Sequence, residues 1–97
     1  MSAYMVIQAE ISDMVQFMKY AVAAGQLIEK YGASYVVRGA KQAETLEGDF
    51  NEETKVVISK WPSFEKAKEF WNSPEYTEIK KLREGAATVR VRLLDAV

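Results

Sequence analysis

The chain contains no cysteine and no histidine, and these two absences exclude more chemistry than any residue present. Without cysteine there is no disulfide, thiolate nucleophile, iron–sulfur cluster or thiolate zinc site. Without histidine there is no imidazole general base, no Ser-His triad and no histidine ligation of haem or zinc. No calcium-type loop of spaced Asp and Asn residues occurs either. We therefore expect no metal site and no cofactor, and any catalysis would depend on carboxylates, Tyr, Lys, Arg or Ser.

The sequence also lacks an excess of charge of one sign and lacks long apolar runs. Thirteen basic and fourteen acidic side chains give a net charge of −1, without the basic excess that nucleic acid or anionic lipid selects. No apolar run approaches the roughly 20 residues that cross a bilayer, and the N-terminus lacks the order of a signal peptide. We expect one domain over residues 1–97, located in the cytoplasm, with no nucleic acid or membrane partner.

The first half of the chain predicts a strand followed by a long helix. Residues 4–11 are rich in β-formers and partly alternate, as in a half-buried strand. Asp13 is a good N-cap and Gln16 would complete a capping box, while Gly32 suits the residue after the helix. The predicted apolar stripe consists of Met14, Phe17, Met18, Ala21, Ala24, Gly25, Ile28 and Tyr31. Its helical period favours core packing, and a cofactor slot is the alternative.

Two further strands are predicted at 34–42 and 54–61 from their β-branched content. The segment between them, 43–53, contains five acids and no base. It is typical of a solvated connection, and a cation site is the alternative. Trp61-Pro62 should end the third strand because proline cannot continue a ladder. Ser63 is then expected to cap a helix.

The stretch "NSPEYTEIKKLREGA" at 72–86 admits a structural and a functional interpretation. Ser73 is a preferred N-cap, Pro74 suits the first helical position, and Glu75 faces the positive end of the helix dipole. The stretch therefore predicts a restarted helix that ends at Gly85. In the functional interpretation, Tyr76 or Arg83 also faces a ligand. The final segment, 87–97, alternates like a half-buried last strand.

This order of elements predicts a ferredoxin-like βαββαβ fold of the α+β class, with a four-stranded antiparallel sheet and both helices on one face. The other face is predicted to be too apolar for water. Its expected residues are Tyr4, Val6, Gln8, Glu10, Val36, Arg38, Val57, Ser59, Trp61, Arg90 and Arg92. A second copy of the chain is the simplest cover, which would make a homodimeric α+β barrel. Glu10 would then pair with an arginine, or the arginines would be paired structurally, reach solvent or bind an anion.

The residues that carry a family resemblance extend over almost the whole chain. They are Arg38-Gly39, Leu46-Glu47-Gly48, Val56-Val57-Ile58, Trp61-Pro62-Ser63, Ser73-Pro74-Glu75-Tyr76, Leu82-Arg83 and Gly85-Ala86. In order and spacing they resemble the bacterial family called domain of unknown function 1330. The resemblance implies a ferredoxin-like subunit that assembles into a dimeric α+β barrel, and it implies no activity. The chain departs from the family pattern at Ala40, where members tend to have Gly, and at Lys60, where they often have an acid.

Three hypotheses of function follow. The first is binding of a small polar or anionic molecule in a cavity between sheet and helices. The candidate ligand-binding residues are Arg38, Tyr76, Arg83, Arg90, Arg92 and Trp61. The second is a cofactor-independent oxygenase or isomerase, with Tyr76 or Glu10 as acid and base. The third is a structural or interaction dimer without a ligand.

Overall fold

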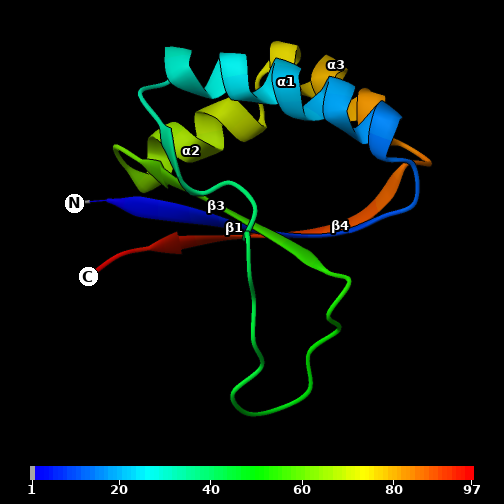
Figure 1. The fold of residues 1–97 in the computed structure, drawn as a ribbon. Coiled ribbons are helices and arrows are strands. Elements are labelled where there is room, and N and C mark those ends of the chain that lie inside the picture. The colour runs from blue at the N-terminus through cyan, green and yellow to red at the C-terminus, as the bar shows by residue number, and fades with distance from the viewer. Residues whose placement is uncertain (1) are drawn as a thin grey trace.

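A computed structural model describes residues 2–97 and shows a helix layer on one side of a single sheet (Figure 1). The elements in chain order are β1 (Ala3–Ile11), α1 (Met14–Lys30), β2 (Ser34–Val37), β3 (Lys55–Trp61), α2 (Phe64–Trp71), α3 (Pro74–Lys80), the 3₁₀ turn η1 (Lys81–Arg83) and β4 (Ala87–Asp95). The α+β class and the ferredoxin-like order are confirmed. The second strand is shorter than predicted, because β2 ends at Val37 and not at residue 42.

The sheet has the strand order β2-β3-β1-β4, and every neighbouring pair is antiparallel. The helices all cover the same face of this sheet, and the opposite face, which we call the open face, has no element over it (Figure 1). The segment between β2 and β3 leaves the sheet on the open side and contains no helix or strand.

The predicted side-chain faces are correct for β1 and β4 but wrong for β3. Ala3 pairs with Trp61 and Met5 pairs with Ser59, so these residues share one face. Ala3 and Met5 are buried in the core, which places Val57, Ser59 and Trp61 under the helices and not on the open face. The open face of β3 consists of Val56, Ile58 and Lys60, because successive side chains alternate.

Helix α1 begins and ends as predicted, but its buried stripe is rotated. The Asp13 carboxylate accepts a hydrogen bond from the Gln16 backbone N–H, and Gly32 follows the helix with a φ of 78°. The capping box is not completed, because the Gln16 side chain donates to the Leu82 carbonyl. The buried residues are Phe17, Tyr20, Ala24, Leu27 and Ile28, whereas Met14 and Met18 are both 50% exposed.

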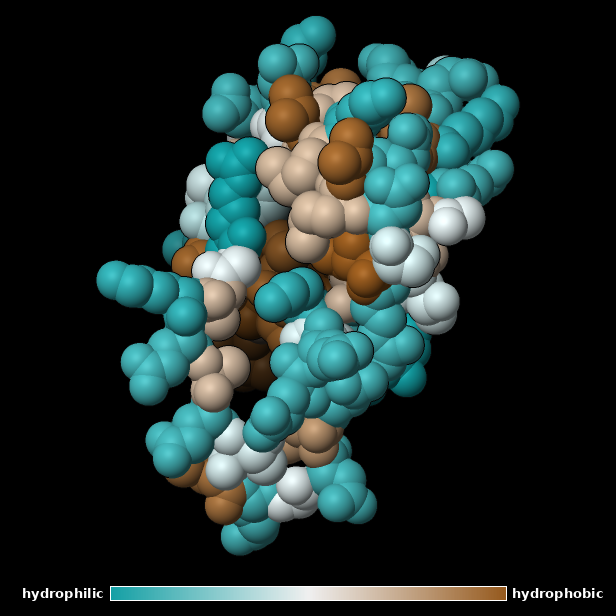
Figure 2. Space-filling model, turned by 45° about the vertical axis from the view of Figure 1, so that its right-hand side comes forward, coloured by the Kyte–Doolittle hydropathy of each residue, from teal (hydrophilic) through white to brown (hydrophobic). Residues whose placement is uncertain are grey.

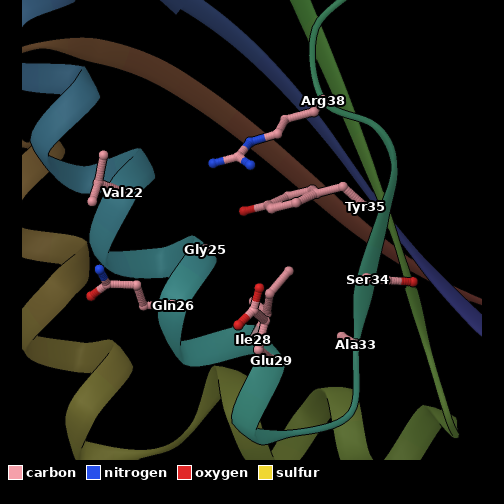
Figure 3. Close-up of a pocket in the computed structure, with 9 residues that line it drawn as sticks. All are labelled: Val22, Gly25, Gln26, Ile28, Glu29, Ala33, Ser34, Tyr35 and Arg38. Atoms are coloured by element: carbon pink, nitrogen blue, oxygen red, sulfur yellow. The ribbon is translucent and has the colours of Figure 1, made fainter.

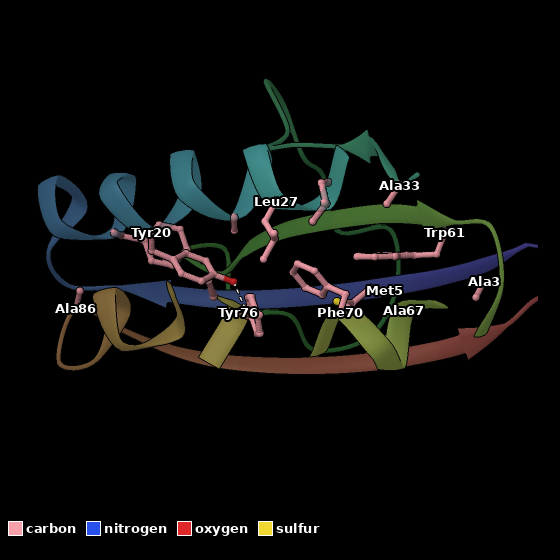
Figure 4. Packing of buried hydrophobic residues seen from close by; sticks show 14 residues of the cluster. Ala3, Met5, Tyr20, Leu27, Ala33, Trp61, Ala67, Phe70, Tyr76 and Ala86 are labelled. Carbon is pink, nitrogen blue, oxygen red and sulfur yellow. Dashed lines mark hydrogen bonds between the residues drawn. The ribbon is translucent and has the colours of Figure 1, made fainter. Parts of the chain in front are cut away.

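The core lies between α1, α2, α3 and the sheet and is rich in aromatic rings (Figure 4). The ring centroids of Trp61 and Phe70 are 4.8 Å apart, and those of Phe70 and Tyr76 are 4.4 Å apart, with the rings tilted in both pairs. Ser63 and Ser73 cap α2 and α3, as predicted. Within residues 2–97, no helix combines the length and hydropathy that crossing a membrane requires.

Candidate functional site

Two tyrosines from separate helices form a buried pair beneath α1. Tyr20 lies on the core side of α1. Ser73 caps the start of α3, and Tyr76 of that helix points toward Tyr20. Their hydroxyl oxygens are 2.8 Å apart, within hydrogen-bond distance (Figure 4). Tyr20 is 7% exposed and Tyr76 is 2% exposed. One hydroxyl donates to the other, which leaves the second proton of the pair for another acceptor.

The cation beside this pair is Arg83, at the end of η1. Its guanidinium carbon lies 5.2 Å from the centre of the Tyr20 ring. The Nε of Arg83 is buried and has no hydrogen-bond partner among residues 2–97. The ion pairs found in residues 2–97 join Lys66 to Glu69 and Lys81 to Glu78, so none involves Arg83. A buried N–H of a charged group without an acceptor is costly, and most such groups in proteins are satisfied.

The environment of Tyr20 keeps its phenol protonated. Burial raises the pKa of Tyr20 far above its ordinary value, and the neighbouring Tyr76 raises it further, while Arg83 lowers it only in part. A phenol that stays protonated cannot act as a base, but its O–H can donate a hydrogen bond to an anion. The chemistry that this pair offers at neutral pH is therefore donation of a hydrogen bond.

A groove of about 440 Å³ lies between α1 and the segment that contains β2 (Figure 3). Arg38 stacks over the ring of Tyr35, with its guanidinium carbon 4.9 Å from the ring centre. Arg38 therefore lies on the helix side, at the groove, and the prediction that it lies on the open face is wrong. Gly25 of α1 faces this pair, and a Cβ added there would lie 3.4 Å from Nη2 of Arg38. The absence of a side chain at Gly25 thus leaves space for the stacked pair. The remaining lining residues are Val22, Gln26, Ile28, Glu29, Ala33 and Ser34.

The groove and the buried tyrosine pair are separate, because Tyr20, Tyr76 and Arg83 are not among the residues that line the groove. Burial raises the pKa of Tyr35, and Arg38 lowers it in part. The structure thus contains two arginine–tyrosine stacks, Arg38 on Tyr35 at the groove and Arg83 on Tyr20 in the core.

The other predicted site residues lie elsewhere. Glu10 is exposed at the edge of the open face, where it accepts hydrogen bonds from Asn51 and Thr54 at 3.3 and 3.5 Å. Arg90 and Arg92 are exposed on the open face, paired in register with Gln8 and Val6. Trp61 is 1% exposed, and its indole N–H donates to Ser59. The structure thus brings Tyr76 and Arg83 together, with Arg38 beside Tyr35, and separates the other predicted residues from them.

Sequence reasoning missed Tyr20 and Tyr35. Tyr20 lies three residues after Phe17 and four before Ala24, so the helical period alone was sufficient to place it on the buried face. Tyr35 alternates with Ser34 and Val36 in a short strand, where period two identified the faces but not which one met the helices. No group of three His, Cys, Asp or Glu residues among positions 2–97 is arranged to hold a metal ion.

One face of the molecule is hollowed, with hydrophobic residues on the floor of the hollow and hydrophilic side chains around it (Figure 2). A concave surface with an apolar floor and a few polar groups is the usual form of a small-molecule site.

The family described as "Domain of unknown function (DUF1330)" matches residues 2–97. Among curated proteins, none matches the sequence. Among solved structures, a protein of unknown function from Rhodopseudomonas palustris, RPA0582, is similar with a TM-score of 0.75 and 21% identity. The match covers 99% of this chain and 82% of that one.

Two further structures share the fold at lower identity. SnoaB from Streptomyces nogalater, a cofactor-independent oxygenase, has a TM-score of 0.68 and 12% identity, with 99% of this chain and 93% of that one covered. A protein described as an antibiotic biosynthesis monooxygenase has a TM-score of 0.62 and 14% identity, with 98% of each chain covered. At such identities the likeness shows the fold alone.

Proposed function

This chain belongs to the DUF1330 family, and we propose that it binds a small anionic molecule at Arg83, beneath α1. The observation that carries the proposal is Arg83, whose buried Nε has no acceptor. A guanidinium that is partly removed from water is stabilised when an anion pairs with it. A carboxylate or enolate is the expected group, because its oxygens accept the hydrogen bonds that a guanidinium donates.

The neighbouring phenols support an anionic ligand over a cationic one. Burial keeps Tyr20 neutral, so the Tyr20–Tyr76 pair has one proton that it can donate to a ligand oxygen. Arg38 adds a second positive charge beside the groove. The groove beside Arg38, which does not include Arg83, has a volume within the range of roughly 300 to 1,000 Å³ that small-molecule sites occupy.

A cofactor-independent enzyme of the oxygenase or isomerase type is the second candidate. The observation that favours it is the same donor set, because a phenol and a guanidinium at one point stabilise an enolate oxyanion. Tyr20 is unsuited to be the base, since its pKa is raised, and Glu10 is exposed on the far side of the sheet. Tyr76 therefore remains the acid–base candidate.

We also propose that the protein is a homodimer whose subunits pack through their open faces. Tyr4, Val6, Val56, Ile58 and Leu94 place apolar surface there by register, and Leu94 is 43% exposed. A two-fold axis would pair this surface with itself. A dimer with no ligand, the third hypothesis, is the outcome if no anion binds.

Binding of benzoate and other small carboxylates, measured by calorimetry and by thermal shift, tests the anion site. A ligand present at about 100 times its Kd should stabilise the folded protein by about 2.7 kcal/mol. Arg83→Met should weaken the affinity about 10- to 100-fold, because it removes a charged hydrogen-bond donor. Arg90→Met is the matched control, since Arg90 lies exposed on the open face, and it should leave the affinity unchanged. Equal weakening by both variants would argue against a site at Arg83.

A further inference from the structure

We infer that residues 38–54, which we call the acidic arm, clasp the open face of the second subunit in the dimer proposed above. The arm begins where β2 ends at Val37 and finishes where β3 begins at Lys55. Figure 1 shows that it extends past the sheet on the side away from the helices. A second copy packed against the open face would occupy this same side, so the arm would reach across its surface.

The arm carries apolar side chains that no part of its own subunit covers. Leu46 is 88% exposed and Phe50 is 70% exposed. Hydrophobic patches are visible in the otherwise mostly hydrophilic lowest part of the molecule, which is this arm (Figure 2). If the arm served only to connect two strands, these positions would be expected to be polar. Burial against a partner would remove both side chains from water, which is favourable in proportion to the apolar area.

The charges of the arm and of the open face are complementary. The arm contains the acids Glu44, Glu47, Asp49, Glu52 and Glu53 against the two bases Arg38 and Lys41, and all five acids lie in its part after residue 43. The open face presents the exposed bases Lys60, Arg90 and Arg92. Neither set takes part in an ion pair within residues 2–97. Opposite charges that both lack partners in the subunit fit a contact between subunits, where they fix the register of the two chains.

A second copy is the occupant that these observations favour. In a two-fold dimer each arm meets the partner's open face in the same way. Both acidic arms and both basic patches then gain partners of opposite charge. An unrelated acidic or basic partner would satisfy only one of the two patches. The contact would add apolar area at the rim of the interface between the sheets.

Cross-linking tests the arm contact directly. Because the chain has no cysteine of its own, the introduced cysteines are the only thiols available to the reagent. A tagged Leu46→Cys chain is mixed with an untagged Arg92→Cys chain and treated with a short bis-maleimide. We expect a covalent product of one tagged and one untagged chain. A Leu46→Cys and Glu69→Cys mixture is the control, because Glu69 is an exposed residue of the helix layer, and it should give little product. A yield no higher than in this control would overturn the proposal.

The dimer dissociation constant separates this inference from the dimer itself. The double variant Leu46→Ser/Phe50→Ser should raise the Kd roughly 100-fold or more, since each apolar side chain is lost from both arms. A wild-type dimer whose Kd is unchanged in the variant would refute the clasp and leave the open-face dimer intact. A monomeric wild-type protein would refute both.

Discussion

Arg83 is the residue on which the functional account depends. Its neighbours are a phenol ring and the end of a short helix, and its Nε has no acceptor. A buried N–H without an acceptor lowers stability, and an apolar side chain of similar length removes that cost. The loss of stability that the unsatisfied N–H of Arg83 causes is explained if a bound anion pairs with this arginine.

We predict that Arg83→Met leaves the ligand-free protein as stable as the wild type or more stable, by up to about 1 kcal/mol. The measurement is urea unfolding without any added anion. Arg38→Met should lower stability slightly, because Arg38 stacks on an accessible tyrosine ring. A large loss of stability in Arg83→Met would mean that Arg83 serves the fold, and the anion site would lose its main support.

The raised pKa of Tyr20 predicts how the stability of the folded protein changes at alkaline pH. Its folded pKa lies well above the ordinary value of 10.0. Above about pH 10 the unfolded chain therefore releases the Tyr20 proton while the folded chain retains it, and stability falls as pH rises. The contribution amounts to about 1.4 kcal/mol per pH unit for one proton.

Urea unfolding between pH 9 and 11 checks this expectation. The stability of Tyr20→Phe should decline less steeply with pH than that of the wild type. Identical slopes in Tyr20→Phe and the wild type would show that Tyr20 is not held protonated by the fold.

At the scale of the element, the caps were predictable because their chemistry is local. Ser73 and Pro74 begin a helix whatever the rest of the chain does, and the structure places them as the sequence indicated. The faces of β3 were not predictable in this way. Val56 and Ile58 on one face are as apolar as Val57 and Trp61 on the other, so alternation could not decide which side met the helices. The predicted stripe of α1 is rotated relative to the buried one because it includes Met14 and Met18, which are half-exposed.

Ser73 should be a sensitive position, since it accepts from the Tyr76 backbone N–H and donates to the Phe70 carbonyl. Ser73→Ala is expected to lower the free energy of unfolding by about 1 to 2 kcal/mol. Chemical denaturation measures the loss. Ser34→Ala, an exposed residue of β2, should change stability by less than about 0.5 kcal/mol. A comparable effect of both changes would contradict the cap.

Gly25 tests the packing of α1 against the groove. An alanine Cβ would meet Arg38 Nη2 at 3.4 Å and Tyr35 Cε2 at 3.7 Å, which the flexible arginine can accommodate. Gly25→Ala should therefore stabilise the helix by about 0.5 to 1 kcal/mol. Gly25→Leu should displace the Tyr35–Arg38 stack and weaken binding of carboxylates to the groove. Unchanged affinity in Gly25→Leu would show that the ligand does not occupy this groove.

At the scale of the whole molecule, the layer order was predictable from the sequence and the location of the site was not. The order of the elements predicts four strands with the helices on one face, and the structure has this arrangement. The site needed the contacts between α1, η1 and α3, which join residues far apart in the chain. No local sequence pattern indicates that Tyr20 and Arg83 lie close together. The sequence therefore predicts Arg83 as a site residue but does not predict the tyrosine beside it.

The open-face dimer makes its own prediction. The wild-type protein should sediment with twice the subunit mass of 11.0 kDa at micromolar concentration. Val6→Lys places a charge at the centre of the open face and should yield a monomer that still unfolds cooperatively, because the core is untouched. Sedimentation and thermal unfolding of both proteins provide the measurement. A wild-type monomer would contradict the assembly.

The most direct test of the anion site is a crystal structure with 4-bromobenzoate, whose bromine is located by its anomalous scattering. We predict a bromine peak beneath α1, with the carboxylate on Arg83 and a hydroxyl of the Tyr20–Tyr76 pair. Bromine found only beside Arg90 or Arg92 on the open face, or no bromine beside Arg83 at a concentration that stabilises the protein in solution, would contradict it.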